Sequence, residues 1–350
     1  MNFKLVIFAV ALIVALSAVA VVLPAEKADA DDGFEYAAQY PAYNEGELTY
    51  YINNANTTKR VIVLQNDISL TSRLPITLSY GDTTNPDTAL SIGNHKIKIT
   101  SSPGNAFSLS VDTGALPDTV RVIHIGVSGE LTLSNVTITG GHPAREASQP
   151  ESGNLDDCGG GIFNTGKLFL YSGAKITGNT ANWAGGGVYN DAYSEFYMYE
   201  GSEVSDNHVT SVTGAADSGG GGVYFGRLWY SSSGTIYGGK ITNNTAAQIG
   251  GGVSLFYNTV LTVNGGEISN NTAPGGGGIW AHGTVILNSG GKITGNHATA
   301  NISGLGGGGI IVTEGTVIVK DGAEISNNTA SMSGGGGICV DTYGGSVTVE

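Results

Sequence analysis

The feature that most constrains the fold of this chain is a repeated run of glycines. Three or four glycines precede an aliphatic residue seven times, and these aliphatic residues are Ile162, Val188, Val223, Val253, Ile279, Ile310 and Ile338. The successive intervals are 26, 35, 30, 26, 31 and 28 residues. The 56 glycines make up 16% of the chain, against a usual share of about 7%. A fixed period of this size indicates a repeat protein rather than a disordered linker.

A second motif lies between the glycine runs. It consists of an aliphatic residue, Ser or Thr, any residue, and Asn, as in "ITGN" and "ISNN". Its asparagines are Asn179, Asn207, Asn244, Asn271, Asn296 and Asn328. The aliphatic residue after a glycine run precedes the next motif asparagine by 17 to 21 residues, whereas that asparagine precedes the next such aliphatic residue by 8 to 16. Because variable spacing marks a loop, we expect every repeat to carry its loop at the same place.

Apolar residues alternate with polar or smaller ones in the nearly fixed part of the repeat. Leu168 and Leu170 form one such pair, Val285 and Leu287 another, and each pair precedes a Gly-containing turn and a further apolar position. This pattern predicts three short strands per repeat. Repeats of about 25 to 30 residues without helices predict an all-β parallel β-helix, whose coils stack about 4.8 Å apart. A propeller blade would need about 40 residues and four strands.

The N-terminal half carries less regular versions of the same pattern. Residues 61–70, 97–100, 120–127 and 131–141 have strand character, so we expect irregular coils to about residue 140 and regular coils from about 159. Residues 44–54 are the one amphipathic helical candidate, and we expect residues 31–59 to cap a β-helix spanning 60–350. The sequence stops within a predicted coil, which suggests a fragment of a longer protein.

The first 30 residues predict export from the cytoplasm. A positive start, an apolar stretch over 5–23 and an Ala-x-Ala ending at Ala30 are typical of a secretory signal peptide. The apolar stretch has 19 residues, so a retained membrane anchor is the alternative. We expect a secreted or cell-surface protein that meets a membrane only through such an anchor. The net charge of −14 argues against nucleic acid as a partner.

The motif asparagines are expected to form a ladder. Stacked coils would place the six side-chain amides above one another, where each can donate to the next, and Asn also tolerates the left-handed backbone of a tight corner. N-glycosylation is the alternative interpretation, because Asn243, Asn270 and Asn327 begin Asn-x-Thr sequons. These first asparagines of each pair could point outward while the second ones point inward.

An aromatic row is the candidate binding site. Alternation places Trp280 on the outside of its strand, and Phe163, Tyr189 and Tyr224 occupy matching positions in other coils. An exposed row of this kind predicts binding of sugar rings or protein partners. Cross-strand packing of the same side chains beneath the variable loops is the alternative. The glycine runs do not form phosphate loops, because no Gly-Lys-Ser/Thr sequence followed by a helix occurs.

The titratable residues give little evidence of metal or redox chemistry. The six histidines are scattered, and we expect no metal, cofactor or catalytic residue. Cys158 and Cys339 would lie six coils apart, roughly 29 Å along the axis at the usual strand spacing. A disulfide needs Cα atoms within about 7 Å, so we do not expect these two cysteines to pair.

The alternation of Gly-Gly-aliphatic motifs ("GGGIF", "GGGVY", "GGGGIW") with an x-x-x-Asn motif over residues 130–350 resembles polymorphic outer membrane protein repeats, within the pectin-lyase-like group. The second motif of that family usually begins with Phe, where this chain has Ile or Val. The resemblance implies a right-handed parallel β-helix and a non-enzymatic surface domain that acts as an adhesin, with cell-surface glycans or proteins as partners.

The same superfamily contains polysaccharide lyases and glycoside hydrolases, which supply the alternative function. Asp156-Asp157-Cys158 resembles the "DDC" element of polygalacturonases, whose paired carboxylates act as acid and base. The Asn-Thr-Asp, Gly-His-Gly and Arg-Ile-Lys motifs of that family are absent. We therefore expect no enzymatic activity.

Overall fold

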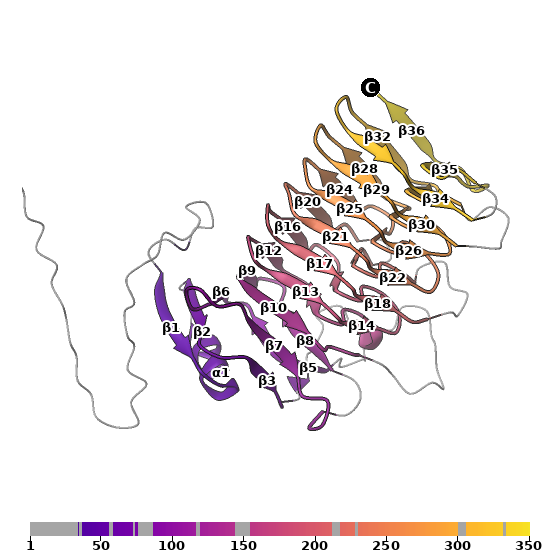
Figure 1. Ribbon diagram of the computed structural model, residues 1–350. Helices are drawn as coiled ribbons and strands as arrows, with labels where there is room; N and C mark the ends of the chain where they lie inside the picture. The colour runs from indigo at the N-terminus through magenta and orange to yellow at the C-terminus, as the bar shows by residue number, and fades with distance from the viewer. Residues whose placement is uncertain are drawn as a thin grey trace, which may run out of the picture.

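The chain folds into a right-handed parallel β-helix (Figure 1). The computed structural model describes residues 34, 37–55, 59–72, 74–75, 87–116, 120–143, 155–211, 218–227, 230–299, 306–331 and 334–350. The predicted signal peptide, residues 1–30, lies outside these ranges. No helix within them is long and apolar enough to span a membrane.

Two of the four sheets form adjoining sides of the solenoid. Sheet A consists of β1 (Ala38–Ala42), β2 (Arg60–Leu64), β6 (Lys96–Ser101), β9 (Glu130–Ser134), β12 (Lys167–Leu170), β16 (Glu195–Met198), β20 (Ser233–Ile236), β24 (Val260–Val263), β28 (Thr284–Leu287), β32 (Thr316–Val319) and β36 (Ser346–Val349). Sheet B consists of β3 (Ile68–Leu70), β7 (Phe107–Val111), β10 (Val136–Thr139), β13 (Lys175–Thr177), β17 (Glu203–Ser205), β21 (Lys240–Thr242), β25 (Glu267–Ser269), β29 (Lys292–Thr294) and β33 (Glu324–Ser326).

The remaining strands form two further sheets. Sheet C consists of β4 (Leu74–Pro75), β5 (Asp87–Gly93), β8 (Arg121–Ile125), β11 (Ile162–Asn164), β15 (Val188–Asn190), β19 (Val223–Phe225), β23 (Val253–Leu255), β27 (Ile279–Ala281), β31 (Ile310–Val312) and β35 (Ile338–Val340). Sheet D consists of β14 (Thr180–Ala181), β18 (His208–Val209), β22 (Thr245–Ala246), β26 (Thr272–Ala273), β30 (His297–Ala298) and β34 (Thr329–Ala330). Of the described strands, only β4 and β5 pair antiparallel.

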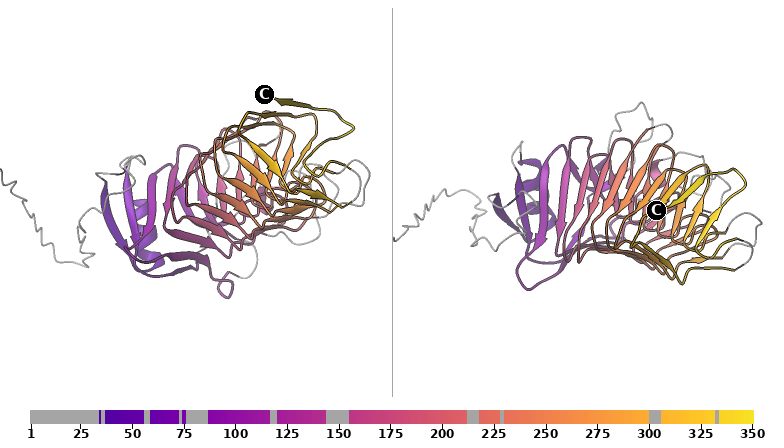
Figure 2. Two further views of the ribbon diagram at one scale, coloured as in Figure 1. Left: turned by 45° about the horizontal axis from the view of Figure 1, so that its top comes forward. Right: turned by 90° about the horizontal axis from the view of Figure 1, so that it is seen from above.

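Each regular coil contains four strands, not the three predicted. The chain passes through sheets C, A, B and D in turn, as in β11, β12, β13 and β14. The strand of sheet D directly follows the ladder asparagine, and its two residues are too few to show alternation in the sequence. Strands of successive coils lie side by side along the whole stack (Figure 2).

The predicted N-terminal helix is present as α1 (Glu45–Asn53), with Asn44 as its N-cap, whose side chain accepts the Glu47 N–H at 3.0 Å. Leu48 and Ile52 are buried in the main core, and the helix contacts β1, β3 and β5. Figure 1 places α1 at the N-terminal end of the stack. The helix therefore covers the apolar interior that the first coil would otherwise expose. Strand β1 was not predicted, and it extends sheet A by one strand.

The core consists of apolar columns that run along the axis. Leu168 pairs with Leu131 in one neighbouring coil and with Phe196 in the other, and all three side chains are fully buried. In-register parallel pairing places equivalent residues above one another, so the alternation seen in one repeat becomes a continuous hydrophobic column in the fold.

The outer face of sheet B carries a column of alternating charge. Its members, in coil order, are Lys175, Glu203, Lys240, Glu267, Lys292 and Glu324. Each lysine forms an ion pair with the glutamate that follows it in the column, at 3.8, 3.8 and 3.3 Å. Thr and Ser alternate in the neighbouring outward column in the same order. The coils therefore come in two kinds that follow each other strictly.

The cysteines lie far apart, as expected. Six coil steps in sheet C separate the coil of Cys158 from that of Cys339. At about 4.8 Å per coil this distance excludes a disulfide between them.

Candidate binding face

The motif asparagines form a continuous ladder at the corner between sheets B and D. It runs through Asn179, Asn207, Asn244, Asn271, Asn296 and Asn328. In each step Nδ2 of one asparagine donates to Oδ1 of the next, at 3.0 Å in four steps and 2.9 Å in the fifth. The same Oδ1 accepts the backbone N–H of the preceding ladder residue. The first five ladder residues are at most 1% exposed.

The left-handed backbone of this corner belongs to the residue before each ladder asparagine. The residues at that position are Gly178, Asp206, Asn243, Asn270, Gly295 and Asn327, and their φ angles lie between 54° and 66°. Gly, Asn and Asp tolerate this region best. The left-handed backbone was predicted for the ladder residue itself, and that prediction was wrong by one position.

The glycine runs pack against backbone, which explains three consecutive glycines in each run. Gly276 has a φ of 59°, so it requires the left-handed region. A Cβ on Gly277 would lie 2.4 to 2.6 Å from backbone atoms of His297, and one on Gly278 would lie 2.5 Å from the carbonyl oxygen of Gly309. Three consecutive positions thus exclude side chains for different reasons. The runs are structural corners that lie directly against the asparagine ladder.

The predicted exposed aromatic row is buried. Phe163 is fully buried, and Tyr189, Tyr224 and Trp280 are 3 to 4% exposed. Phe163 and Tyr189 stack with ring centroids 5.1 Å apart, and Tyr189 and Tyr224 stack at 5.2 Å.

Chain segments outside the coils cover this row. Leu155, Cys158 and Trp183 pack over the three stacked rings, while Trp280 belongs to a separate cluster with Ile249 and Ile311. The prediction of an exposed binding row was therefore wrong, and the alternative of packing beneath the loops is correct.

The two aspartates of the "DDC" element lie in a 3-10 helix, Leu155–Asp157, at the edge of this covering segment. Asp157 is buried, and Asn182 Nδ2 donates to its carboxylate at 3.4 Å. The buried Arg121 donates to the carbonyl oxygens of Leu155 and Asp156 at 2.9 and 3.0 Å. These contacts fix the helix against the coil. They indicate a structural role for the segment.

An accessible aromatic surface lies instead on the outer face of sheet A. In the first coils this face is covered, because Phe34 packs on Val61 and Val63. Outward aromatic side chains with partial exposure begin with Phe169 in β12. We define the aromatic face as Phe169, Tyr171, Tyr197, Tyr199 and Tyr237, whose strands pair in register. Tyr171 is buried at 7% exposure, whereas the other four rings are half-buried or exposed.

The rings of the aromatic face form two parallel stacks. Phe169 and Tyr197 lie 4.9 Å apart with 10° between their planes. Tyr171 and Tyr199 lie 4.4 Å apart at 8°, and Tyr199 and Tyr237 lie 5.1 Å apart at 16°. Tyr237 ends its stack and is 49% exposed. Rings inside a stack have both faces covered, so they can offer a ligand only their edges and hydroxyl groups.

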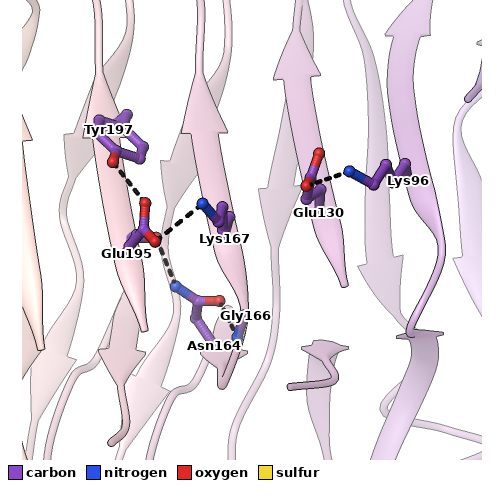
Figure 3. Close-up of polar contacts among 7 residues, drawn as sticks. All are labelled: Lys96, Glu130, Asn164, Gly166, Lys167, Glu195 and Tyr197. Atoms are coloured by element: carbon purple, nitrogen blue, oxygen red, sulfur yellow. Dashed lines mark hydrogen bonds and ion pairs between the residues drawn. The ribbon is translucent and has the colours of Figure 1, made fainter. Parts of the chain in front are cut away.

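Charged groups beside the aromatic face are paired (Figure 3). Lys96 contacts Glu130 at 2.6 Å, and Lys167 contacts Glu195 at 2.9 Å. The Tyr197 hydroxyl donates to Glu195 at 2.6 Å. Partial burial would raise the pKa of Glu195, but the hydrogen bonds from Tyr197 and Lys167 outweigh it and lower this pKa. Glu195 is therefore an ionised acceptor, and the face carries balanced charge.

Two uncharged groups continue the second stack. The column of Tyr171, Tyr199 and Tyr237 leads to Asn264 and Asn288, and Asn288 Nδ2 donates to Asn264 Oδ1 at 2.6 Å. Hydroxyl and amide groups thus repeat at the coil spacing over five coils. A row of this kind suits an extended neutral ligand that lies along the axis.

This face was not predicted, although the sequence carries a signal for it. The alternation that identified Leu168 and Leu170 as inward residues also places Phe169 and Tyr171 outward, and both are aromatic. Comparisons of the chain with family models, with curated proteins and with solved structures find no match.

Proposed function

We propose that this chain is a secreted or cell-surface, non-enzymatic β-helix that binds glycans through the aromatic face of sheet A. The resemblance to polymorphic outer membrane protein repeats favours an adhesin-like role. The observation that carries the proposal is the pair of ring stacks on one lateral face, in which every ring except Tyr171 is half-buried or exposed. Tyr rings combine apolar surface with a hydroxyl group, which suits the mixed apolar and polar surface of a sugar.

The charge pattern supports a neutral glycan as the ligand. Lys167 and Glu195 compensate each other, and the column beyond Tyr237 continues with Asn264 and Asn288. The net charge of −14 disfavours acidic polysaccharides at long range. The repetition of like groups along the axis favours a linear ligand aligned with the solenoid.

A glycan array with the purified chain tests the proposal. We expect the double variant Tyr199→Ala/Tyr237→Ala to lose about 10- to 100-fold in affinity, since each aromatic contact is worth roughly 0.5 to 1.5 kcal/mol. Tyr343→Ala is the matched control, because Tyr343 is 76% exposed and lies in the last coil. Equal binding by the double variant and the unaltered chain would refute the assignment of this face.

The enzymatic alternative predicts product formation. If the chain were a polysaccharide lyase or hydrolase, incubation with polysaccharides would release reducing or unsaturated ends, and Asp156→Asn with Asp157→Asn would abolish the signal. We expect no signal from either protein. Turnover that depends on these aspartates would overturn the non-enzymatic assignment.

A further inference from the structure

The Asn-x-Thr sequons of the regular coils share one position in the fold. Asn243, Asn270 and Asn327 each occupy the left-handed corner residue directly before a ladder asparagine. All three side chains are exposed, whereas the ladder residues Asn244 and Asn271 are buried. The corner therefore separates the two asparagines of each pair by function: the second holds the coils together, and the first faces solvent.

The threonine of each sequon lies on the same outer surface as its first asparagine. Thr245, Thr272 and Thr329 begin strands of sheet D and lie outside the core, because the residue after each one points inward. Asparagine and threonine thus lie at positions i and i+2 on one side of the backbone, with the ladder asparagine between them on the other side.

We propose that Asn243, Asn270 and Asn327 are N-glycosylation sites that form one glycan-bearing edge along the corner between sheets B and D. In the reaction, the Asn Nδ2 forms a bond to the anomeric carbon of a lipid-diphosphate-linked oligosaccharide. The bond from that carbon to the diphosphate oxygen breaks, and the lipid diphosphate leaves with the proton lost by the amide.

The fold explains why these asparagines can carry a glycan. In the folded chain the Thr245 hydroxyl contacts His208 Nδ1, and the Thr329 hydroxyl contacts His297 Nδ1 at 2.6 Å. These contacts occupy the two threonine hydroxyl groups in the folded chain. We therefore place transfer of the glycan before the coils stack. A glycan on an outward corner leaves the ladder and the core free to form.

Other asparagines do not meet these conditions. A glycan on Asn271 would abolish its bond to Asn296 and would have to be buried. Asn135 also begins a sequon, but it precedes the regular coils, and a glycan on its Nδ2 would compete with the bond that this atom donates to the carbonyl oxygen of Asn105 once the chain folds. The glycan-bearing edge is therefore restricted to the exposed corner positions of the regular coils.

The sites are not equally spaced. Asn243 and Asn270 lie in adjacent coils, about 4.8 Å apart along the axis, whereas one coil with Gly295 at the corner separates Asn270 from Asn327. Crowding at adjacent coils makes Asn327 the site of highest expected occupancy.

Glycopeptide mass spectrometry of the full chain, secreted from a eukaryotic cell line, tests the proposal. We expect glycan on Asn327 and on at least one of Asn243 and Asn270. Substitution of each by glycine removes that glycan without disturbing the corner, because Gly178 and Gly295 occupy the same position in other coils. Asp206→Gly is the matched control, since it changes the same position in a coil without a sequon, and it should leave the glycan pattern unchanged.

The result that overturns the proposal is a secreted chain in which all three asparagines are unmodified. The sequons at Asn56 and Asn301, which lie outside the described residues, report whether the molecules met the transferase. Glycan on those two alone counts against the glycan-bearing edge. Because the readout is modification of the chain itself, it is independent of whether the aromatic face binds a ligand.

Discussion

Removal of one ladder amide should destabilise the β-helix more than its single side chain suggests. Asn271 Nδ2 donates to Asn296 Oδ1 and to the Ile241 carbonyl, both at 3.0 Å. Its Oδ1 accepts Asn244 Nδ2 at 3.0 Å and the Asn244 backbone N–H at 2.9 Å. Asn271→Ala therefore deletes four hydrogen bonds. The buried Asn244 N–H and Ile241 carbonyl lose the bonds that Asn271 supplied.

The expected cost follows from those two buried groups. Each unsatisfied group costs about 1 to 3 kcal/mol, so Asn271→Ala should lower the free energy of unfolding by about 2 to 6 kcal/mol. At about 2.1 cal/mol/K per residue, a chain of 350 residues loses about 1.4 °C of Tm per kcal/mol, so Tm should fall by about 3 to 8 °C. The neighbouring Asn270→Gly is the control, because Asn270 is exposed and glycine suits its φ of 55°. Thermal unfolding followed by circular dichroism measures both. If Tm of Asn271→Ala fell no further than that of Asn270→Gly, the ladder would not stabilise the fold as argued.

Three further predictions concern stability. Gly277→Ala should lower Tm sharply or prevent folding, because its Cβ would lie 2.4 Å from the His297 carbonyl oxygen, and a Tm within 1 °C of the unaltered chain would contradict this packing. Lys240→Glu should destabilise the chain by roughly 0.5 to 1 kcal/mol at low salt, because it places like charges beside Glu267, and a shift that salt does not reduce would argue against an electrostatic cause. Burial, and to a smaller extent a nearby arginine, lower the pKa of His124 to about 3, so the unfolded chain binds the extra proton first and stability falls as pH drops from about 6.5 towards 3. His124→Phe should weaken this pH dependence of Tm, because it removes a loss of unfolding free energy of about 3 kcal/mol at pH 4. An unchanged slope of Tm against pH would show that other groups dominate.

The fold was largely predictable because its repeat converts local patterns into stacked columns. Alternation at Leu168 and Leu170 predicted a strand, and the recurrence of the pattern predicted its neighbours. The two-residue strands such as Thr180–Ala181 were not predictable in this way, since alternation needs more residues than they have. The strands of sheet D can be recognised only in the folded structure, where their backbone groups pair between stacked coils.

The site was less predictable because exposure depends on segments outside the repeat. Alternation correctly separated Phe163 from the main core, but it could not reveal that Leu155 and Trp183 cover it. The same alternation places Phe169 on the outer side of its strand, and there the side chain remains partly accessible. The alternation of apolar and polar residues indicates which side of a strand a residue occupies. Whether solvent reaches its side chain depends on distant segments of the chain.

The alternating column on sheet B restricts how a protein of this kind can change in length. Loss of the single coil that carries Glu267 would bring Lys240 against Lys292, whereas loss of two coils would bring Lys240 against Glu324 and restore attraction. Gene duplications and deletions that preserve this surface therefore add or remove coils in pairs. The unit that preserves this charge column is therefore two coils long, although the shortest repeat visible in the sequence is one coil.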